Sequence, residues 1–184
     1  MNDPVLGPLT RDEKFGGYTT DEKTVAFLGG HRCRFVFESY ADDPRPDEIR
    51  RAVQNALDAT PALLGAAEPY VVRYCEEMLE RYDEGQRPDV TLAKPSDVWS
   101  HVQFGSVFFV SRRADGDAED GVYLSLECNC DWEIEHGLQL VLRDGRNVSK
   151  VGPFDGHLTN EDAFADRSLI GLVYRPMGPR RQRR

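Results

Sequence analysis

The sequence predicts an α+β domain: an antiparallel sheet with two amphipathic helices packed on one face. Segments with the alternating pattern of β-strands occupy the first 40 residues and the region after residue 98. Two stretches with apolar residues at helical spacing lie between them. The segments after residue 98 are joined by short connections, which favours a four-strand antiparallel meander that the N-terminal strands continue or pack against.

The N-terminal third is expected to be rich in strands. Gly29-Gly30 fits a turn that needs positive φ, so the segments on either side of it are expected to pair as a hairpin. Aromatic and β-branched residues at 34–38 support a strand there. The expected strands are residues 5–9, 15–20, 24–28 and 33–40.

Two helices are expected next. Pro46 starts the first, whose apolar positions from Ile49 to Leu57 follow a spacing of three and four residues. The Thr60-Pro61 pair marks its boundary, because a residue before proline is disfavoured in the α region. The second helix is expected at residues 69–82, with an apolar stripe that starts at Val71 and an acidic, solvated outer face.

The second half returns to strand patterns. Residues 98–111 form a long strand that Gly105 is expected to interrupt with a bulge. Asp144-Gly145 predicts a type I′ turn between two later strands. Those remaining strands are expected at residues 122–128, 138–142 and 147–151, with a short helix at 158–165 capped by Thr159 or Asn160 and a final strand or helix end at 169–174.

The length and charge of the chain indicate its domain organisation and the charge of a suitable partner. We expect one domain over residues 1–174 and a basic, disordered tail over residues 175–184. The formal charge is −9, and without the five Arg of the tail the remaining 18 basic and 32 acidic residues leave −14. Phosphate backbones would repel so acidic a body, which argues against nucleic acid as a partner and suits a basic protein.

The sequence predicts a cytoplasmic protein with reduced thiols. It contains no apolar run of about eighteen residues that would indicate a membrane span, and its start lacks the pattern of a secretory signal. The four cysteines, Cys33, Cys75, Cys128 and Cys130, do not define a disulfide framework.

The most distinctive stretch connects the strands at 122–128 and 138–142. A connection that only reversed the chain would need little beyond Gly, Asn or Asp, yet this one carries thiols, an indole, an imidazole and carboxylates. We predict a binding surface here that would suit a partner presenting Lys or Arg, with Trp132 adding contact area if it is partly exposed. In the competing interpretation Trp132 is a core residue that only pins the loop. The predicted binding residues are Asp131, Trp132, Glu133, Glu135, His136, Asp155 and His157.

The alternative is a metal-dependent or thiol hydrolase centred on Cys128, Cys130, His136 and His157. A single Cys-x-Cys pair is a weak metal signal, because structural zinc sites normally use two spaced pairs. Neighbouring carboxylates would raise the pKa of a thiol and weaken it as a nucleophile. The acidic stretch 115–121 lacks the glycine and glutamate positions of a calcium loop. The sequence therefore favours a non-enzymatic role without a metal or another cofactor.

A resemblance rests on the run from Glu127 to Gln139, on Val151-Gly152, and on the run from Asp155 to Thr159. These motifs resemble an uncharacterised family of bacterial proteins, a domain of unknown function similar to families found among immunity proteins of bacterial toxin systems. The resemblance is specific over residues 98–160. It implies an intracellular α+β protein and brings no catalytic residues. The expected function is therefore a protein-binding module, with an immunity-type inhibitor as its most specific form.

Overall fold

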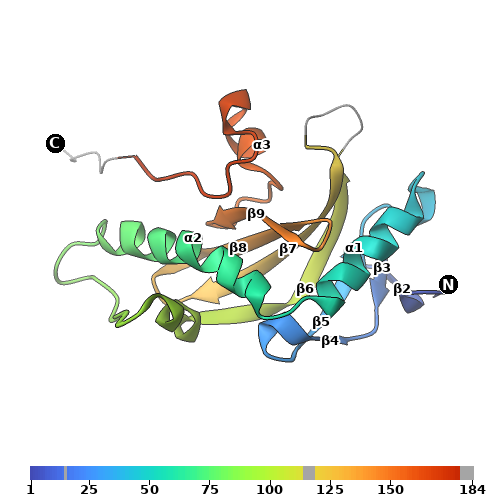
Figure 1. Cartoon of the computed structure of the whole chain (residues 1–184), viewed down its shortest axis with the longest axis horizontal. Coiled ribbons are helices and arrows are strands. Elements are labelled where there is room, and N and C mark those ends of the chain that lie inside the picture. Colours follow the sequence, from blue (N-terminus) through green and yellow to red (C-terminus); the bar gives the residue numbers. More distant parts are fainter. Residues whose placement is uncertain (15, 114–118, 179–184) are drawn as a thin grey trace.

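The structure, a computed structural model, describes residues 1–14, 16–113 and 119–178. It is a mixed α+β domain built on a mostly antiparallel sheet, which confirms the α+β class predicted from the sequence. Figure 1 shows the strongly curved sheet with two helices crossing in front of it. No helix of the described residues is both long enough and apolar enough to cross a membrane.

The strands are β1 (Asn2–Asp3), β2 (Gly7–Asp12), β3 (Gly17–Thr20), β4 (Lys23–Val25), β5 (His31–Phe37), β6 (Val102–Arg113), β7 (Gly121–Cys130), β8 (Glu133–Arg143) and β9 (Asn147–Gly152). The α-helices are α1 (Pro46–Asp58), α2 (Ala62–Leu79) and α3 (Asn160–Phe164). Short 3₁₀ helices are η1 (Ala26–Leu28), η2 (Tyr40–Asp42), η3 (Pro95–His101) and η4 (Arg167–Leu169).

The N-terminal strands continue the sheet. Its order is β1-β2-β3-β5-β6-β7-β8-β9, with β4 paired to β5. The pairing of β4 with β5 confirms the expected hairpin around Gly29-Gly30, but the strand expected at residues 24–28 ends at Val25 and residues 26–28 form η1. Strand β5 pairs with β6 in parallel, whereas the other pairings of the described strands are antiparallel. Parallel neighbours need a long crossover, and here α1, α2 and η3 supply it.

The expected start of the second helix at residue 69 is wrong, because α2 already begins at Ala62 and contains Pro69 in its interior. A proline there removes one hydrogen bond to the carbonyl four residues earlier, that of Gly65. Both Gly65 and Pro69 are exposed, so water can satisfy that carbonyl and the helix continues. The first helix matches its prediction, with Ile49, Ala52, Val53 and Ala56 buried.

The later strands differ from expectation mainly at their ends. The segment expected as one strand from residue 98 starts with η3, and β6 begins at Val102. Its register against β7 shifts between Phe104 and Phe108, which confirms the irregularity predicted at Gly105. Asp144 and Gly145 both have positive φ, 53° and 67°, and Arg146 N–H donates to Arg143 O, as a type I′ turn requires.

The C-terminal segment covers the edge of β9. Thr159 caps α3 as predicted, its side chain accepting a hydrogen bond from Asp162 N–H. No strand forms at residues 169–174 within the described chain; η4 ends at Leu169 and an irregular segment follows. Val151 of β9 donates its N–H to Val173 O at 2.8 Å, so this segment protects the sheet edge. Of the predicted tail, residues 179–184 lie outside the described residues, as do residues 115–118 of the calcium-like stretch.

Candidate functional site

The connection between β7 and β8 is a two-residue turn, Asp131-Trp132, followed by a large bulge in β8. Cys130 pairs with Glu133, and the next pair is Cys128 with Leu138, so β8 advances five residues while β7 advances two. The extra residues, 134–137, leave the regular ladder; we call them the β8 bulge. Bulges of this kind redirect side chains and are common beside functional sites.

Gly137 makes the β8 bulge possible. Its φ is 60°, and a Cβ at this position would lie only 2.3 Å from the carbonyl oxygen of Cys128. Only glycine avoids both the left-handed strain and this collision. The hydroxyl of Tyr74, which is buried on α2, donates to Gly137 O at 2.9 Å and fixes the end of the bulge.

Glu133 supports the bulge from beneath. Its side chain is buried, and its carboxylate accepts hydrogen bonds from the N–H of Glu135 at 2.9 Å and of His136 at 2.7 Å. His136 Nδ1 lies 3.4 Å from the same carboxylate. Because both oxygens bind the chain itself, Glu133 shapes the predicted surface but offers little of its carboxylate to a partner.

Trp132 lies in the core. It is 0% exposed, and its ring makes an edge-to-face contact with Tyr74 at 5.9 Å between centroids. Tyr82 OH donates to Trp132 O at 3.2 Å. The condition under which Trp132 would add contact area, partial exposure, is therefore not met. The arrangement matches the competing interpretation, in which the indole pins the turn to α2.

The exposed residues of this end are a different set. Ile134 is 86% exposed, and Glu135 and His136 are exposed beside it. Asp131 accepts hydrogen bonds from His101 Nδ1 at 2.9 Å and Gln103 Nε2 at 3.2 Å. The hydrogen bond from His101, followed by that from Gln103, holds the pKa of Asp131 below its ordinary value.

The structure places the second predicted segment beside the bulge, since Phe154 N–H donates to His136 O at 3.1 Å. The side chain of Asp155 accepts from His157 N–H at 2.9 Å and from the ammonium of Lys150. His157 is exposed. The structure thus brings the segment at 154–157 next to the β8 bulge, while Asp131 contacts His101 and Gln103, and Trp132 and Glu133 are buried.

Lys150 is a buried cation that the sequence analysis missed. Its three donors reach Asp155 Oδ1, Gln139 Oε1 at 3.1 Å and His157 O at 3.1 Å. Burial lowers the pKa of Lys150, and the carboxylate of Asp155 opposes that shift. Since an ammonium has three N–H groups and all are used, Lys150 holds the segment at 155–157 in place.

The residues of the alternative hydrolase site do not converge. Cys128 and Cys130 are buried, and burial raises the pKa of each thiol to about 12, the opposite of what a nucleophile needs. His136 and His157 are at the surface. Among the described residues, one group of three side chains has metal-ligand spacing, Glu133, Glu135 and His136, and it contains neither cysteine.

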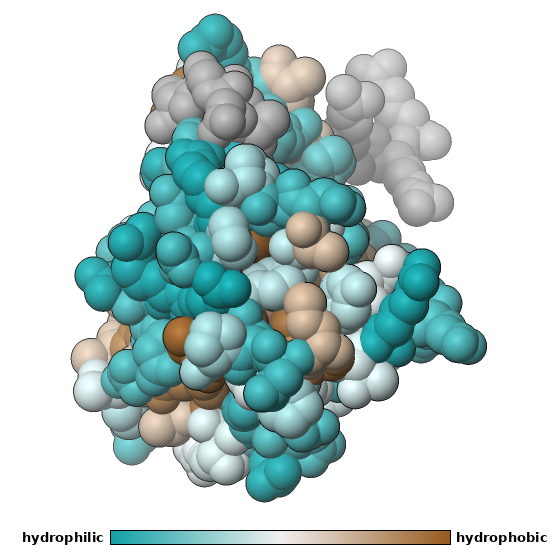
Figure 2. All heavy atoms as spheres, turned by 90° about the vertical axis from the view of Figure 1, so that its right-hand side faces the viewer, coloured by the Kyte–Doolittle hydropathy of each residue, from teal (hydrophilic) through white to brown (hydrophobic). Residues whose placement is uncertain are grey.

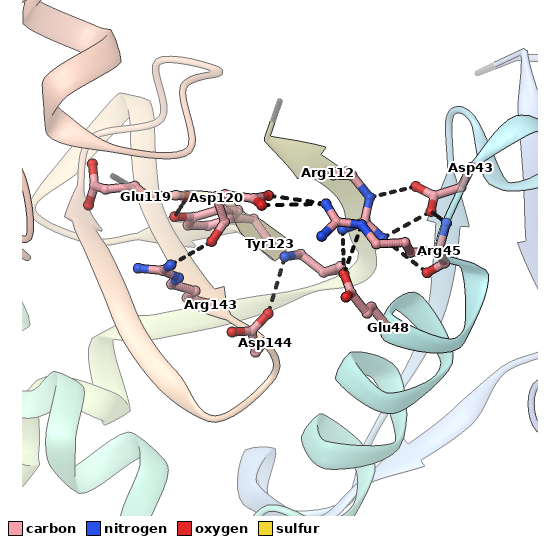
Figure 3. A network of polar contacts seen from close by, with 10 residues as sticks. Asp43, Arg45, Glu48, Arg112, Glu119, Asp120, Tyr123, Arg143 and Asp144 are labelled. Atoms are coloured by element: carbon pink, nitrogen blue, oxygen red, sulfur yellow. Dashed lines mark hydrogen bonds and ion pairs between the residues drawn. The ribbon is translucent and has the colours of Figure 1, made fainter. Parts of the chain in front are cut away.

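A second polar cluster, unanticipated from the sequence, lies at the other end of β7 (Figure 3). Arg112 of β6 donates to both oxygens of Asp43 at 2.8 and 2.9 Å and to Glu48 at 2.6 Å. Arg45 reaches Asp120 at 3.4 Å. An open crevice of about 380 Å³ lies alongside. Arg112 is paired with acids on the segment that begins α1, so this cluster fastens α1 to the sheet.

Among the described residues, the face that carries α1 and the N-terminal strands has no large apolar side chain as exposed as Ile134. Figure 2 shows that hydrophilic residues cover most of it, with apolar residues in small separate patches. In this N-terminal region Met1 is 58% exposed and Val5 is 49% exposed, against 86% for Ile134. The β8 bulge is therefore the better candidate for a specific contact.

Comparison with known proteins gives one match. The model of a family described as Domain of unknown function (DUF6985) matches residues 5–158, a span that includes the whole bulge. No curated protein and no solved structure matches the chain.

Proposed function

The chain belongs to the DUF6985 family of domains of unknown function, and from this premise we propose that it is a protein-binding module for a basic partner. The recognition surface is the β8 bulge with Asp131, Asp155 and His157 beside it. An inhibitor of the immunity type, which binds and blocks a basic toxin, is the most specific form of this proposal.

One observation carries the proposal: the β8 bulge is exposed but rigidly supported. Glu133 holds its N–H groups, Tyr74 holds its last carbonyl, and Trp132 anchors the preceding turn. A preorganised surface loses little conformational freedom on binding, so more of the contact energy remains as affinity. The buried carboxylate of Glu133 lies underneath, whereas Ile134, Glu135 and His136 present exposed side chains.

Charge supports a basic partner. Residues 122–142 contain four carboxylates and neither Lys nor Arg, in a chain with a formal charge of −9. Such a surface attracts a cationic protein over a distance of about 10 Å at moderate ionic strength and raises the association rate. The same field repels nucleic acid and anionic lipid.

The test is capture from a lysate of the organism that encodes the chain, with two variants of equal charge. Asp131→Asn with Glu135→Lys changes the surface by three charges while leaving the buried Glu133 intact. Glu76→Gln with Glu80→Lys makes the same change at exposed positions near the end of α2. We expect a basic protein that wild type and the α2 variant retain and the bulge variant loses.

If all three proteins capture the partner equally, recognition lies elsewhere on the molecule. If both variants lose capture equally, binding depends only on net charge. Replacement of Glu133 is unsuitable for this purpose, because its loss would disturb the bulge itself.

A further inference from the structure

We infer that Ile134 is the apolar anchor of this surface, and that the partner offers an apolar pocket bordered by Lys or Arg. This inference rests on the proposed function and specifies its partner. Ile134 is 86% exposed, the highest value among the exposed large apolar residues of the described chain. Binding energy at interfaces concentrates in a few side chains that fill pockets, while surrounding contacts exclude water.

The support beneath Ile134 separates it from an ordinary exposed isoleucine. It follows directly on Glu133, whose carboxylate accepts hydrogen bonds from the N–H groups of Glu135 and His136. Gly137 closes the bulge against Cys128. The backbone that carries the side chain is therefore held before any partner arrives, and burial of the side chain costs little ordering.

The charged residues on the same bulge as Ile134 indicate what kind of partner surface would bind there. The carboxylate of Glu135 lies within 4.8 Å of the ligand atoms of Glu133 and His136, so negative charge gathers on the same bulge that carries Ile134. A membrane surface bearing anionic lipid would be repelled by these carboxylates. A second copy would bring the same acids against each other at a two-fold contact. A basic protein surface with an apolar pocket satisfies both features.

The chain contains three isoleucines, which provide the measurement and its controls. Ile134 is on the bulge, Ile49 is 4% exposed in the core, and Ile170 is 37% exposed on the C-terminal segment. Labelling the isoleucine δ1 methyl groups with ¹³C gives one NMR signal for each. Ile134→Ser removes one signal and thereby assigns it, without removing a buried group.

Two synthetic peptides of equal length and charge serve as probes, one alternating Lys with Leu and the other alternating Lys with Ser. We expect the Lys–Leu peptide to bind about tenfold more tightly and to shift the Ile134 signal, with the Ile49 signal unchanged. In Ile134→Ser the two peptides should bind alike, with the affinity that charge alone provides.

The remaining outcomes separate the two proposals. Equal binding of both peptides by wild type, lost in Asp131→Asn with Glu135→Lys, leaves the basic-partner function standing and overturns the anchor. A shift of Ile170 in place of Ile134 also overturns the anchor. An Ile134 signal that moves with protein concentration alone assigns the site to a second copy, against this inference. If neither peptide binds to wild type, that result contradicts the basic-partner proposal as well as the anchor.

Discussion

At the scale of single residues, two acidic side chains near the start of β8 have different roles that the sequence alone does not distinguish. Glu133 is buried and binds two backbone N–H groups, whereas Glu135 is exposed two positions later. The same residue type therefore stabilises the fold at one position and is available to a partner at the other. Burial, set by the register of β8 against β7, makes this difference.

This difference predicts unequal costs for two neighbouring substitutions. Glu133→Ala leaves two N–H groups without their charged acceptor, and we expect the free energy of unfolding to fall by about 2 kcal/mol. Glu135→Ala removes an exposed carboxylate and should change it by less than about 0.5 kcal/mol. Urea unfolding of both variants measures the difference. Equal values would mean that the carboxylate of Glu133 does not support the bulge.

At the scale of elements, buried ion pairs fasten peripheral segments to the sheet. Arg113 at the end of β6 binds Glu119, Glu161 and Asp162 at 2.7–3.0 Å, and so ties α3 to the sheet. At the N-terminus, Asp3 of β1 accepts hydrogen bonds from the N–H groups of Val5 and Leu6 and from Tyr40 and Arg50, which brings together the β1–β2 hairpin, η2 and α1.

Docking of the N-terminal hairpin should therefore depend on pH. Burial alone would raise the pKa of Asp3, but its hydrogen bonds outweigh burial and lower the pKa to about 2. Because the folded pKa lies below the unfolded value of 3.8, Asp3 stabilises the fold above pH 3.8. That contribution, about 2 kcal/mol, disappears as the pH falls toward 2.

The measurement is urea unfolding between pH 6 and pH 2 for wild type and Asp3→Asn. The difference in stability between them should be largest at the upper end and shrink below pH 3.8. A difference that stays constant over this range would show that protonation of Asp3 is not what destabilises the hairpin.

At the scale of the whole molecule, the core encloses all four thiols. Cys33 and Cys75 have pKa values raised by burial to about 11, and those of Cys128 and Cys130 are raised to about 12. Thiolate is the reactive form. Ellman's reagent at pH 8 should therefore react with no thiol rapidly in the native protein and with four in urea. One fast-reacting thiol under native conditions would restore the cysteine hydrolase as a candidate.

Features that depend on neighbours in the sequence were predicted correctly, whereas features that depend on contacts between distant segments were missed. The apolar spacing of α1 and the Asp144-Gly145 turn depend on neighbours in sequence, and both were confirmed. Exposure of Ile134 depends on Gly137 passing close to the carbonyl of Cys128, a contact between strands. Burial of Lys150 depends likewise on Asp155 and Gln139 arriving from other segments. The spacing of apolar residues within one segment cannot predict contacts that this segment makes with another.

The parallel pair of β5 and β6 has a consequence for how the chain folds as it is synthesised. Strands β1 to β5 leave the ribosome first, but the neighbour of β5 is made only after α1, α2 and η3. Strands β6, β7 and β8 each pair with the next strand in sequence, so the segment from β6 to β9 can form its pairs quickly because local contacts close short loops. The edge of β5 therefore stays unpaired until β6 has been synthesised, about 65 residues after the end of β5.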